Sequence, residues 1–194
     1  MILGLTGGMG GGKTTAARLF EAEGYRRIDS DALVRDELLI LPEVVRQIEK
    51  KFPDAVDAGT GRVNRGLLAG HVFADEAALA WLENLLHPRL YALWREQLAT
   101  APGARWIVEV PLLFEKGLEN WFDFTVCVAT SSAHQIARLT ERGIPQALAE
   151  QRISKQLSLA QKLERADFVL SNDGTPETLR MQVARLALSL TNAR

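Results

Sequence analysis

The sequence has 194 residues, with 23 Lys and Arg against 24 Asp and Glu and a formal net charge of −1 at pH 7. This balance lacks the basic excess with which general nucleic-acid-binding proteins hold a phosphate backbone, so we expect no nucleic-acid partner. Hydrophobic residues make up 47% and charged residues 24%, a composition that suits a chain with a full buried core and argues against disorder. The length fits one α/β domain that carries an inserted subdomain.

Apolar residues are distributed as in a protein without membrane spans. No apolar run approaches the roughly 18 residues that a membrane helix needs, and the chain opens as a strand without a basic leader segment. The one cysteine, Cys127, lies inside the apolar run 124–128, which favours a buried strand thiol over a catalytic or disulfide-bonded one. We therefore expect a cytoplasmic protein without a membrane partner. A monomer is our expectation as well, but no sequence feature decides the oligomeric state.

Five apolar runs have the length of β-strands, and helical patterns separate them. These runs are Ile2–Thr6, Tyr25–Asp29, Trp106–Val110, Phe124–Ala129 and Asp167–Ser171. Strands that alternate with helices predict a parallel sheet covered by helices on both faces. The long, mostly helical segment from about residue 31 to 100 exceeds a simple crossover, so we expect it to form a substrate-binding subdomain.

Two helix starts are marked by side chains that can bond free backbone groups. Ser132 and Gln135 have the spacing of a capping box, in which the two residues bond each other's backbone N–H groups. Thr175 precedes Pro176, which places a capping hydroxyl before a proline at the first helical position. Both patterns predict where helices begin, without indicating chemistry.

The segment Gly7–Thr14 matches the pattern G-x-x-x-x-G-K-[ST], follows an apolar strand and opens a helix near Lys13. Glycines let successive N–H groups turn inward around phosphate oxygens, beside the positive end of the following helix. Lys13 would then reach the β- and γ-phosphates of ATP, and Thr14 would supply a hydroxyl to Mg²⁺. The predicted nucleotide contacts are Gly10, Gly11, Gly12, Lys13, Thr14 and Thr15. The alternative is a glycine-rich turn without a ligand.

Two carboxylates, Asp29 and Asp31, stand at the carboxyl end of the second strand, where ligands bind in open α/β sheets. Asp31 could accept the proton of an attacking hydroxyl, and Arg35, four residues later, could hold an anionic acceptor. The alternative is structural, because Asp29 or Ser30 could cap a helix and Arg35 could pair with Asp31 on its surface.

Three further charged positions suit phosphoryl transfer. Glu109 lies near the end of the third strand, Trp106–Val110, and could face the water shell of the metal, although a glutamate there could equally cap the next turn. Arg138 and Arg142 recur four residues apart, before the break Gly143-Ile144-Pro145, as in a basic lid that closes over a triphosphate. The alternative for each arginine is an ordinary solvated helix face.

Several motifs, taken in order, resemble the dephospho-coenzyme A kinase family along nearly the whole chain. They are Gly4–Thr14, Asp29-Ser30-Asp31 with Arg35, Leu86-His87-Pro88, Glu109–Glu115 and Ala166–Gly174. The resemblance implies phosphorylation of the ribose 3′-hydroxyl of dephospho-coenzyme A by ATP with Mg²⁺, in a P-loop NTPase fold: three layers, α/β/α, with a five-stranded parallel sheet. Ser30 and the lid stretch after Arg142 depart from the family pattern, which leaves the lid alignment open beyond that arginine.

By the same resemblance, Asp31 is the general base, Lys13 and Thr14 are phosphate and Mg²⁺ contacts, and Arg138 and Arg142 are lid arginines. His87 falls in the family's His-Pro pair, where it contacts substrate or instead caps a carbonyl freed by Pro88.

The resemblance also implies a division of the chain: a core of residues 1–35, 102–137 and 166–194, a substrate-binding subdomain of 36–101, and a lid of 138–165. Asp29, Arg35, His87 and Glu109 are then the expected contacts to dephospho-coenzyme A. The alternatives are a P-loop kinase for another small hydroxylated metabolite or nucleotide, and a nucleotide-dependent switch. Against the switch stands the lack of an Asn/Thr-Lys-x-Asp segment that reads guanine.

Overall fold

The computed structural model describes residues 1–192, which form two compact units. The sheet unit comprises Met1–Asp29 together with the segment that begins at Gly103, and the helical unit comprises Ser30–Pro102. The helical unit thus begins six residues before the expected boundary at residue 36. The reason is that a helix starts at Ser30 and continues without a break into the helical segment that begins at Val34. Residues 138–165, expected as a lid, belong to the sheet unit.

The sheet has five parallel strands in the order β2-β3-β1-β4-β5, which confirms the predicted α/β fold. The strands are β1 Ile2–Gly7, β2 Arg26–Asp29, β3 Trp106–Glu109, β4 Phe124–Ala129 and β5 Phe168–Ser171. Asp29 of β2 and Leu5 of β1 both lie opposite Glu109 of β3. The carboxyl ends of β2 and β3 therefore meet beside the loop that follows β1.

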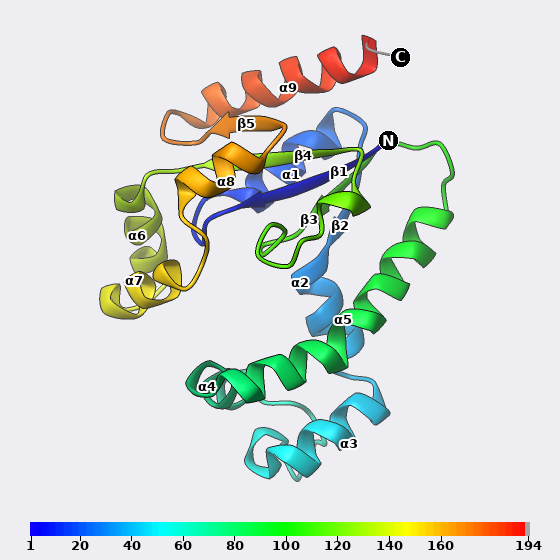
Figure 1. The fold of residues 1–194 in the computed structure, drawn as a ribbon, viewed down its shortest axis with the longest axis vertical. Helices are drawn as coiled ribbons and strands as arrows, with labels where there is room; N and C mark the ends of the chain where they lie inside the picture. Colours follow the sequence, from blue (N-terminus) through cyan, green and yellow to red (C-terminus); the bar gives the residue numbers. More distant parts are fainter. Residues whose placement is uncertain (193–194) are drawn as a thin grey trace. The chain divides into compact units, whose positions relative to one another are not determined.

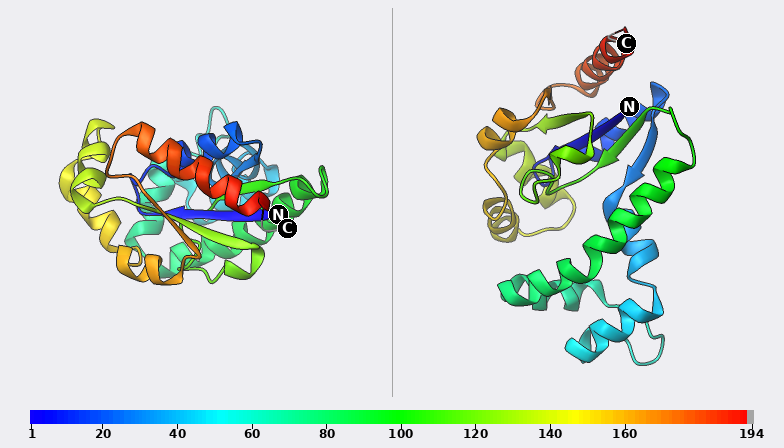
Figure 2. Two further views of the ribbon diagram at one scale, coloured as in Figure 1. Left: turned by 90° about the horizontal axis from the view of Figure 1, so that it is seen from above. Right: turned by 45° about the vertical axis from the view of Figure 1, so that its right-hand side comes forward.

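Helices cover both faces of this sheet (Figure 1). They are α1 Lys13–Ala22, α6 Ser132–Glu141, α7 Gln146–Ser154, α8 Leu159–Arg165 and α9 Pro176–Asn192, with the short 3₁₀ helix η3 Glu119–Trp121. Figure 2 shows α1 and α9 on one side of the sheet and α8 on the other. Phe20 of α1 and Val183 of α9 belong to one buried apolar cluster with Leu5 of β1. Removing this apolar surface from water is the main force that holds the layers together.

Helix starts follow the sequence only in part. The hydroxyl oxygen of Thr175 accepts the N–H of Thr178 at 3.2 Å, as predicted for the start of α9. The predicted capping box at Ser132 is wrong, because Gln135 is buried and its amide donates to the carbonyl of Thr130 at 2.7 Å. A capping box is present instead at the start of α8, where Ser158 and Gln161 bond each other's backbone.

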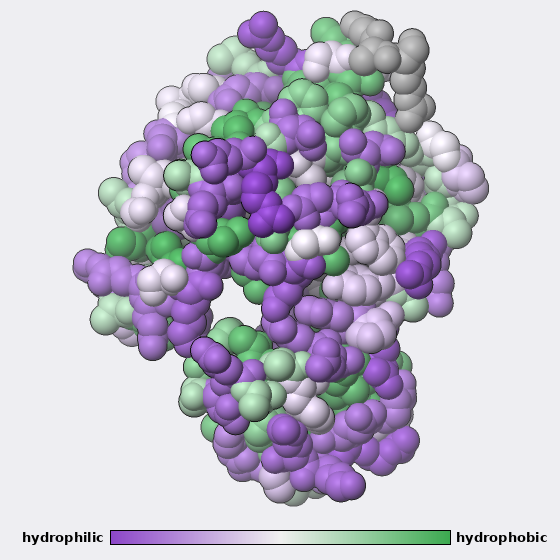
Figure 3. Space-filling view, viewed as in Figure 1, coloured by the Kyte–Doolittle hydropathy of each residue, from purple (hydrophilic) through white to green (hydrophobic). Residues whose placement is uncertain are grey.

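The helical unit contains α2 Ser30–Leu33, the π-helix η1 Val34–Leu38, α3 Pro42–Lys51, the 3₁₀ helix η2 Pro53–Ala55, α4 Arg65–Ala74 and α5 Glu76–Ala99. Its apolar side chains are buried at Val44 and Ile48 of α3 and at Leu68 of α4. Along the described part of the chain, no helix has the length and hydrophobicity needed to cross a membrane. On the face that Figure 3 shows, hydrophilic side chains are interspersed with hydrophobic ones.

The long helix α5 remains continuous although Pro88 lies inside it. A proline lacks the N–H that would complete the helical hydrogen bond, and its ring displaces the preceding turn. The carbonyl that loses this donor is that of Asn84, four residues before Pro88. One guanidinium N–H of Arg89 donates to the next carbonyl, that of Leu85, at 2.7 Å and adds a side-chain bond in the turn beside the proline. His87 lies against the ring of Tyr91, with centroids 5.7 Å apart.

Candidate active site

The loop after β1 has the backbone of a phosphate cradle. Gly10 and Gly12 have positive φ angles of 73° and 91°, which glycine adopts without steric cost. The N–H of Gly11 closes the loop by donating to the carbonyl of Gly8 at 3.0 Å. Gly12 offers no side-chain cap to α1, whose first N–H groups have no partner within the helix. The positive end of α1 therefore faces the loop with donors for an anion.

Lys13, the first residue of α1, folds its side chain back over this loop. Its ammonium group donates to the carbonyls of Gly7 and Gly8, each at 3.1 Å. The ammonium therefore lies at the mouth of the loop.

The hydroxyl of Thr14 connects the loop to an acidic group at the ends of β2 and β3. It donates to Oε2 of Glu109 at 3.0 Å, and Arg27 donates from Nε to Oε1 of the same carboxylate at 2.5 Å. Arg27 also bonds Asp29 at 2.8 Å. Burial is the main cause that raises the pKa of Glu109 above its ordinary value, and the Arg27 guanidinium opposes it.

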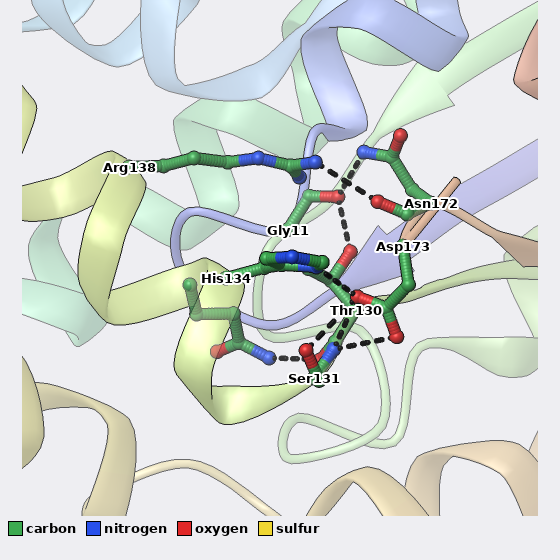
Figure 4. Close-up of polar contacts among 8 residues, drawn as sticks. Gly11, Thr130, Ser131, His134, Arg138, Asn172 and Asp173 are labelled. Atoms are coloured by element: carbon green, nitrogen blue, oxygen red, sulfur yellow. Dashed lines mark hydrogen bonds and ion pairs between the residues drawn. The ribbon is translucent and has the colours of Figure 1, made fainter. Parts of the chain in front are cut away.

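The carbonyl oxygen of Gly11 is held from outside the loop by two buried side chains (Figure 4). Thr130, just after β4, donates its hydroxyl at 2.8 Å, and Asn172, just after β5, donates its amide at 2.9 Å. Arg138 of α6 donates to the backbone carbonyl of Asn172 at 2.9 Å, while its other terminal nitrogen, Nη1, is buried with no hydrogen-bond partner among residues 1–192. Arg138 thus lies beside the loop.

Asp173 fixes the start of α6 next to this contact (Figure 4). Its carboxylate accepts the backbone N–H and the hydroxyl of Ser131, at 2.9 and 3.0 Å, and lies 2.8 Å from Nδ1 of His134. The bond from the Ser131 N–H is the main cause that lowers the pKa of Asp173. The short turn after β5 therefore holds both the glycine loop and the start of α6.

The segment between α7 and α8 also reaches the loop. Gln156 accepts the N–H of Met9 at 3.2 Å through its side-chain oxygen. Nearby, the buried ammonium of Lys162 on α8 forms an ion pair of 2.8 Å with Glu115, which also accepts the N–H of Leu157 at 3.0 Å. These contacts attach α8 and its preceding turn to the sheet unit.

The structure brings most of the predicted residues together, but not all of them. Gly10, Gly11, Gly12, Lys13, Thr14, Thr15, Asp29, Glu109 and Arg138 belong to the sheet unit, around or beside the loop. Arg142 caps the far end of α6 and is exposed, so it does not share the position of Arg138.

The other predicted residues lie in the helical unit. Asp31 is exposed in α2. Arg35 lies in η1 and forms a two-bond ion pair with Asp36, at 2.8 and 2.6 Å. His87 lies in α5, against the ring of Tyr91.

Sequence reasoning missed four residues of the site: Arg27, Thr130, Gln156 and Asn172. Arg27 had a usable signal, because residues two apart on a strand point to the same face and place Arg27 beside Asp29. Asn172 lies in the motif Ala166–Gly174 that carries the family resemblance, but no role was assigned to it. Thr130 and Gln156 are uncharged and far from the loop in the chain, so no local pattern marks them.

Together, the five-stranded parallel sheet, the glycine loop and the Lys13-Thr14 helix start define a P-loop nucleotide-binding protein. The dephospho-CoA kinase family model matches residues 1–177. The chain belongs to the dephospho-CoA kinase family, as the sequence motifs predicted.

Individual relatives agree with this membership. The chain is 37% identical over 186 residues to a dephospho-CoA kinase of Thermobifida fusca, covering 95% of this chain and 93% of that one. It is also similar to the crystal structure of TT1252 from Thermus thermophilus, with a TM-score of 0.85 and 33% identity over 98% and 97% of the two chains. A dephospho-CoA kinase from Campylobacter jejuni shares the fold, with a TM-score of 0.72 and 24% identity over 99% of this chain and 98% of that one.

Proposed function

We propose that this chain transfers the γ-phosphoryl group of ATP to the ribose 3′-hydroxyl of dephospho-coenzyme A, which yields coenzyme A and ADP in the last step of coenzyme A biosynthesis. Membership of the dephospho-CoA kinase family supports the reaction. The observation that carries it in the structure is the glycine loop, with the ammonium of Lys13 above it and the Thr14 hydroxyl bonded to Glu109. We further propose that it works in the cytoplasm as a monomer, with no nucleic-acid or membrane partner.

The triphosphate binds along Gly10, Gly11, Gly12, Lys13, Thr14 and Thr15 in this proposal. The N–H groups of the loop and of the first turn of α1 donate to phosphate oxygens, and the helix end adds positive potential. Lys13 exchanges its two carbonyl partners for phosphate oxygens, which gives the ammonium a charged acceptor.

Thr14 and Glu109 are the residues that would hold Mg²⁺. Their hydroxyl and carboxylate oxygens lie 3.0 Å apart, and oxygen is the ligand that Mg²⁺ prefers. When bound, the ion supplies positive charge to the β- and γ-phosphate oxygens.

Asp31 is the proposed general base. Its carboxylate accepts the proton of the 3′-hydroxyl and orients that oxygen toward the γ-phosphorus. Asp29, Arg35 and His87 are proposed contacts to the acceptor. Such positioning, rather than covalent participation by the protein, supplies most of the rate in phosphoryl transfer.

Arg138 and Arg142 are proposed to neutralise the charge of the migrating group. For Arg138 the support is its place beside the loop and its buried Nη1, which can donate to an anion. Arg142 is exposed at the end of α6, so its role requires that this part of the chain moves when nucleotide binds.

A phosphorylation assay tests the acceptor directly. Dephospho-coenzyme A should be phosphorylated far faster than nucleoside monophosphates, shikimate or gluconate. Asp31→Asn should lower kcat by about 100-fold or more with nearly unchanged ATP affinity, since a general base acts only in the chemical step. Glu37→Gln, which removes another exposed carboxylate from the same segment, is the control and should keep wild-type kcat. Full kcat in Asp31→Asn would exclude Asp31 from the mechanism.

A further inference from the structure

The peptide unit between Gly11 and Gly12 is fixed by side chains that lie outside the glycine loop. Its carbonyl oxygen accepts the Thr130 hydroxyl at 2.8 Å and the Asn172 amide at 2.9 Å (Figure 4). Thr130 is fully buried and Asn172 is 7% exposed. A carbonyl oxygen has two lone pairs, so both of its acceptor positions are filled.

The peptide bond is planar, and in its trans form the C=O and the N–H point in opposite directions. Residues 1–192 contain no cis peptide bond. Holding the Gly11 carbonyl toward Thr130 and Asn172 therefore turns the Gly12 N–H to the opposite side, away from the sheet ends that supply the two donors. Because α1 begins directly after Gly12, this N–H stands beside the first donors of the helix.

The loop cannot enforce this orientation by itself. Gly11 and Gly12 both lack a Cβ, so the two torsion angles that rotate the peptide unit are free of the usual steric limits. Rotation by half a turn would point a carbonyl dipole, rather than an N–H group, at a bound phosphate. An external restraint is needed to keep the donor in place.

The two donors are themselves held rigidly. The backbone N–H of Asn172 bonds the carbonyl of Ala129 at 2.8 Å, and its own carbonyl accepts Arg138 at 2.9 Å. The carbonyl of Thr130 accepts the side chain of Gln135 at 2.7 Å. A Cβ on Gly12 would stand 2.1 Å from the amide nitrogen of Asn172, so any other residue at that position would displace the Asn172 side chain from its bond to the loop.

We propose that Thr130 and Asn172 are positioning residues, which orient the Gly12 N–H toward the phosphates of the nucleotide by holding the Gly11 carbonyl from behind. The inference rests on the proposed function for the identity of the nucleotide. It concerns nucleotide binding alone and needs no acceptor, so the two can fail separately.

The test is calorimetric binding of ADP with Mg²⁺ to purified variants. Thr130→Val keeps the shape of the side chain but loses the donor, and should weaken ADP binding by about tenfold or more, the order expected for one misdirected hydrogen bond to a charged group. Thr130→Ser restores the hydroxyl and should return the affinity to within about threefold of wild type. Asn172→Ala should weaken binding by a similar factor, and the double variant by more than either single change.

Thr140→Val is the matched control, because the Thr140 hydroxyl also bonds a backbone carbonyl, that of Ile136 at 2.9 Å, but on the exposed side of α6. It should bind ADP like wild type. The melting temperature of each variant without nucleotide distinguishes a purely structural role from a positioning role. A purely structural role would lower the melting temperature and leave the ADP affinity of the folded protein unchanged.

Wild-type affinity in folded Thr130→Val would overturn the proposal. If that variant does not fold, wild-type affinity in Asn172→Ala has the same meaning. The two proposals can also be separated. If the wild-type protein binds ADP but does not phosphorylate dephospho-coenzyme A, the proposed function is refuted. Weaker ADP binding by the variants would still support the role of the two side chains.

Discussion

Replacing Lys162 with methionine should strongly destabilise the protein. The ammonium of Lys162 is 1% exposed and pairs with Glu115 at 2.8 Å. Lys162→Met keeps the length of the side chain but leaves a largely buried carboxylate without its cation, and such a change costs about 3–5 kcal/mol. Because the Leu157 N–H still donates to Glu115, we expect the lower part of that range. For a chain of this size, the melting temperature should fall by roughly 6 to 20 °C.

Urea unfolding monitored by tryptophan fluorescence measures the change in the free energy of unfolding. The slope m should be the same for both proteins, which shows that the same unfolding transition is compared. Arg180→Met is the matched control, since Arg180 pairs with Glu177 on the exposed surface of α9, and it should leave stability unchanged. The double replacement Lys162→Met with Glu115→Gln should recover most of the loss, because no buried charge is left unpaired and the neutral amide still offers an acceptor to the Leu157 N–H. A urea midpoint of Lys162→Met equal to that of the wild type would refute the view that the buried Lys162–Glu115 pair stabilises the fold.

The remaining predictions concern two titratable groups. Burial raises the pKa of Cys127 to about 11, so the folded protein should not react with a thiol reagent at pH 8 and should react fully in denaturant; rapid labelling of the native protein would contradict the buried position in β4. Burial also raises the pKa of Glu109 above 4.5, so its contribution to stability is greatest below that pH and is lost as pH rises through the folded value. On acidification Glu109 should accept a proton before an ordinary glutamate does, weakening its bonds to Thr14 and Arg27. kcat/KM for ATP should therefore fall on acidification at a pH above 4.5, and Glu109→Gln should be slower at pH 7 and lack this step; an unchanged profile would exclude Glu109.

The sequence predicted the sheet and the loop well because their signals are local. Strand-length apolar runs and glycines followed by Lys13-Thr14 need no knowledge of distant contacts. The third strand was predicted as Trp106–Val110, one residue longer than β3, and the placement of Glu109 beside the loop follows because parallel strands bring their carboxyl ends to one edge.

Contacts between distant segments could not be predicted in the same way. The start of α6 is bonded by Asp173 from the turn after β5, and this tertiary contact replaces the local capping box expected at Ser132. The expected lid of residues 138–165 includes α8, yet Lys162 anchors α8 through a buried ion pair that sequence patterns do not reveal. We accordingly propose that any closing motion is restricted to α7 and the exposed Gly143 turn before it, because α6 is bonded at its start by Asp173 and along its length through Gln135 and Arg138.

The guanidinium of Arg89 has a consequence for the mechanics of α5. Pro88 removes the N–H that the Asn84 carbonyl would otherwise accept, and the Arg89 side chain adds a bond to the next carbonyl, that of Leu85, so the turn beside the proline gains one side-chain hydrogen bond. Truncating Arg89 would remove this bond next to the proline, and we expect α5 to bend more easily at that turn.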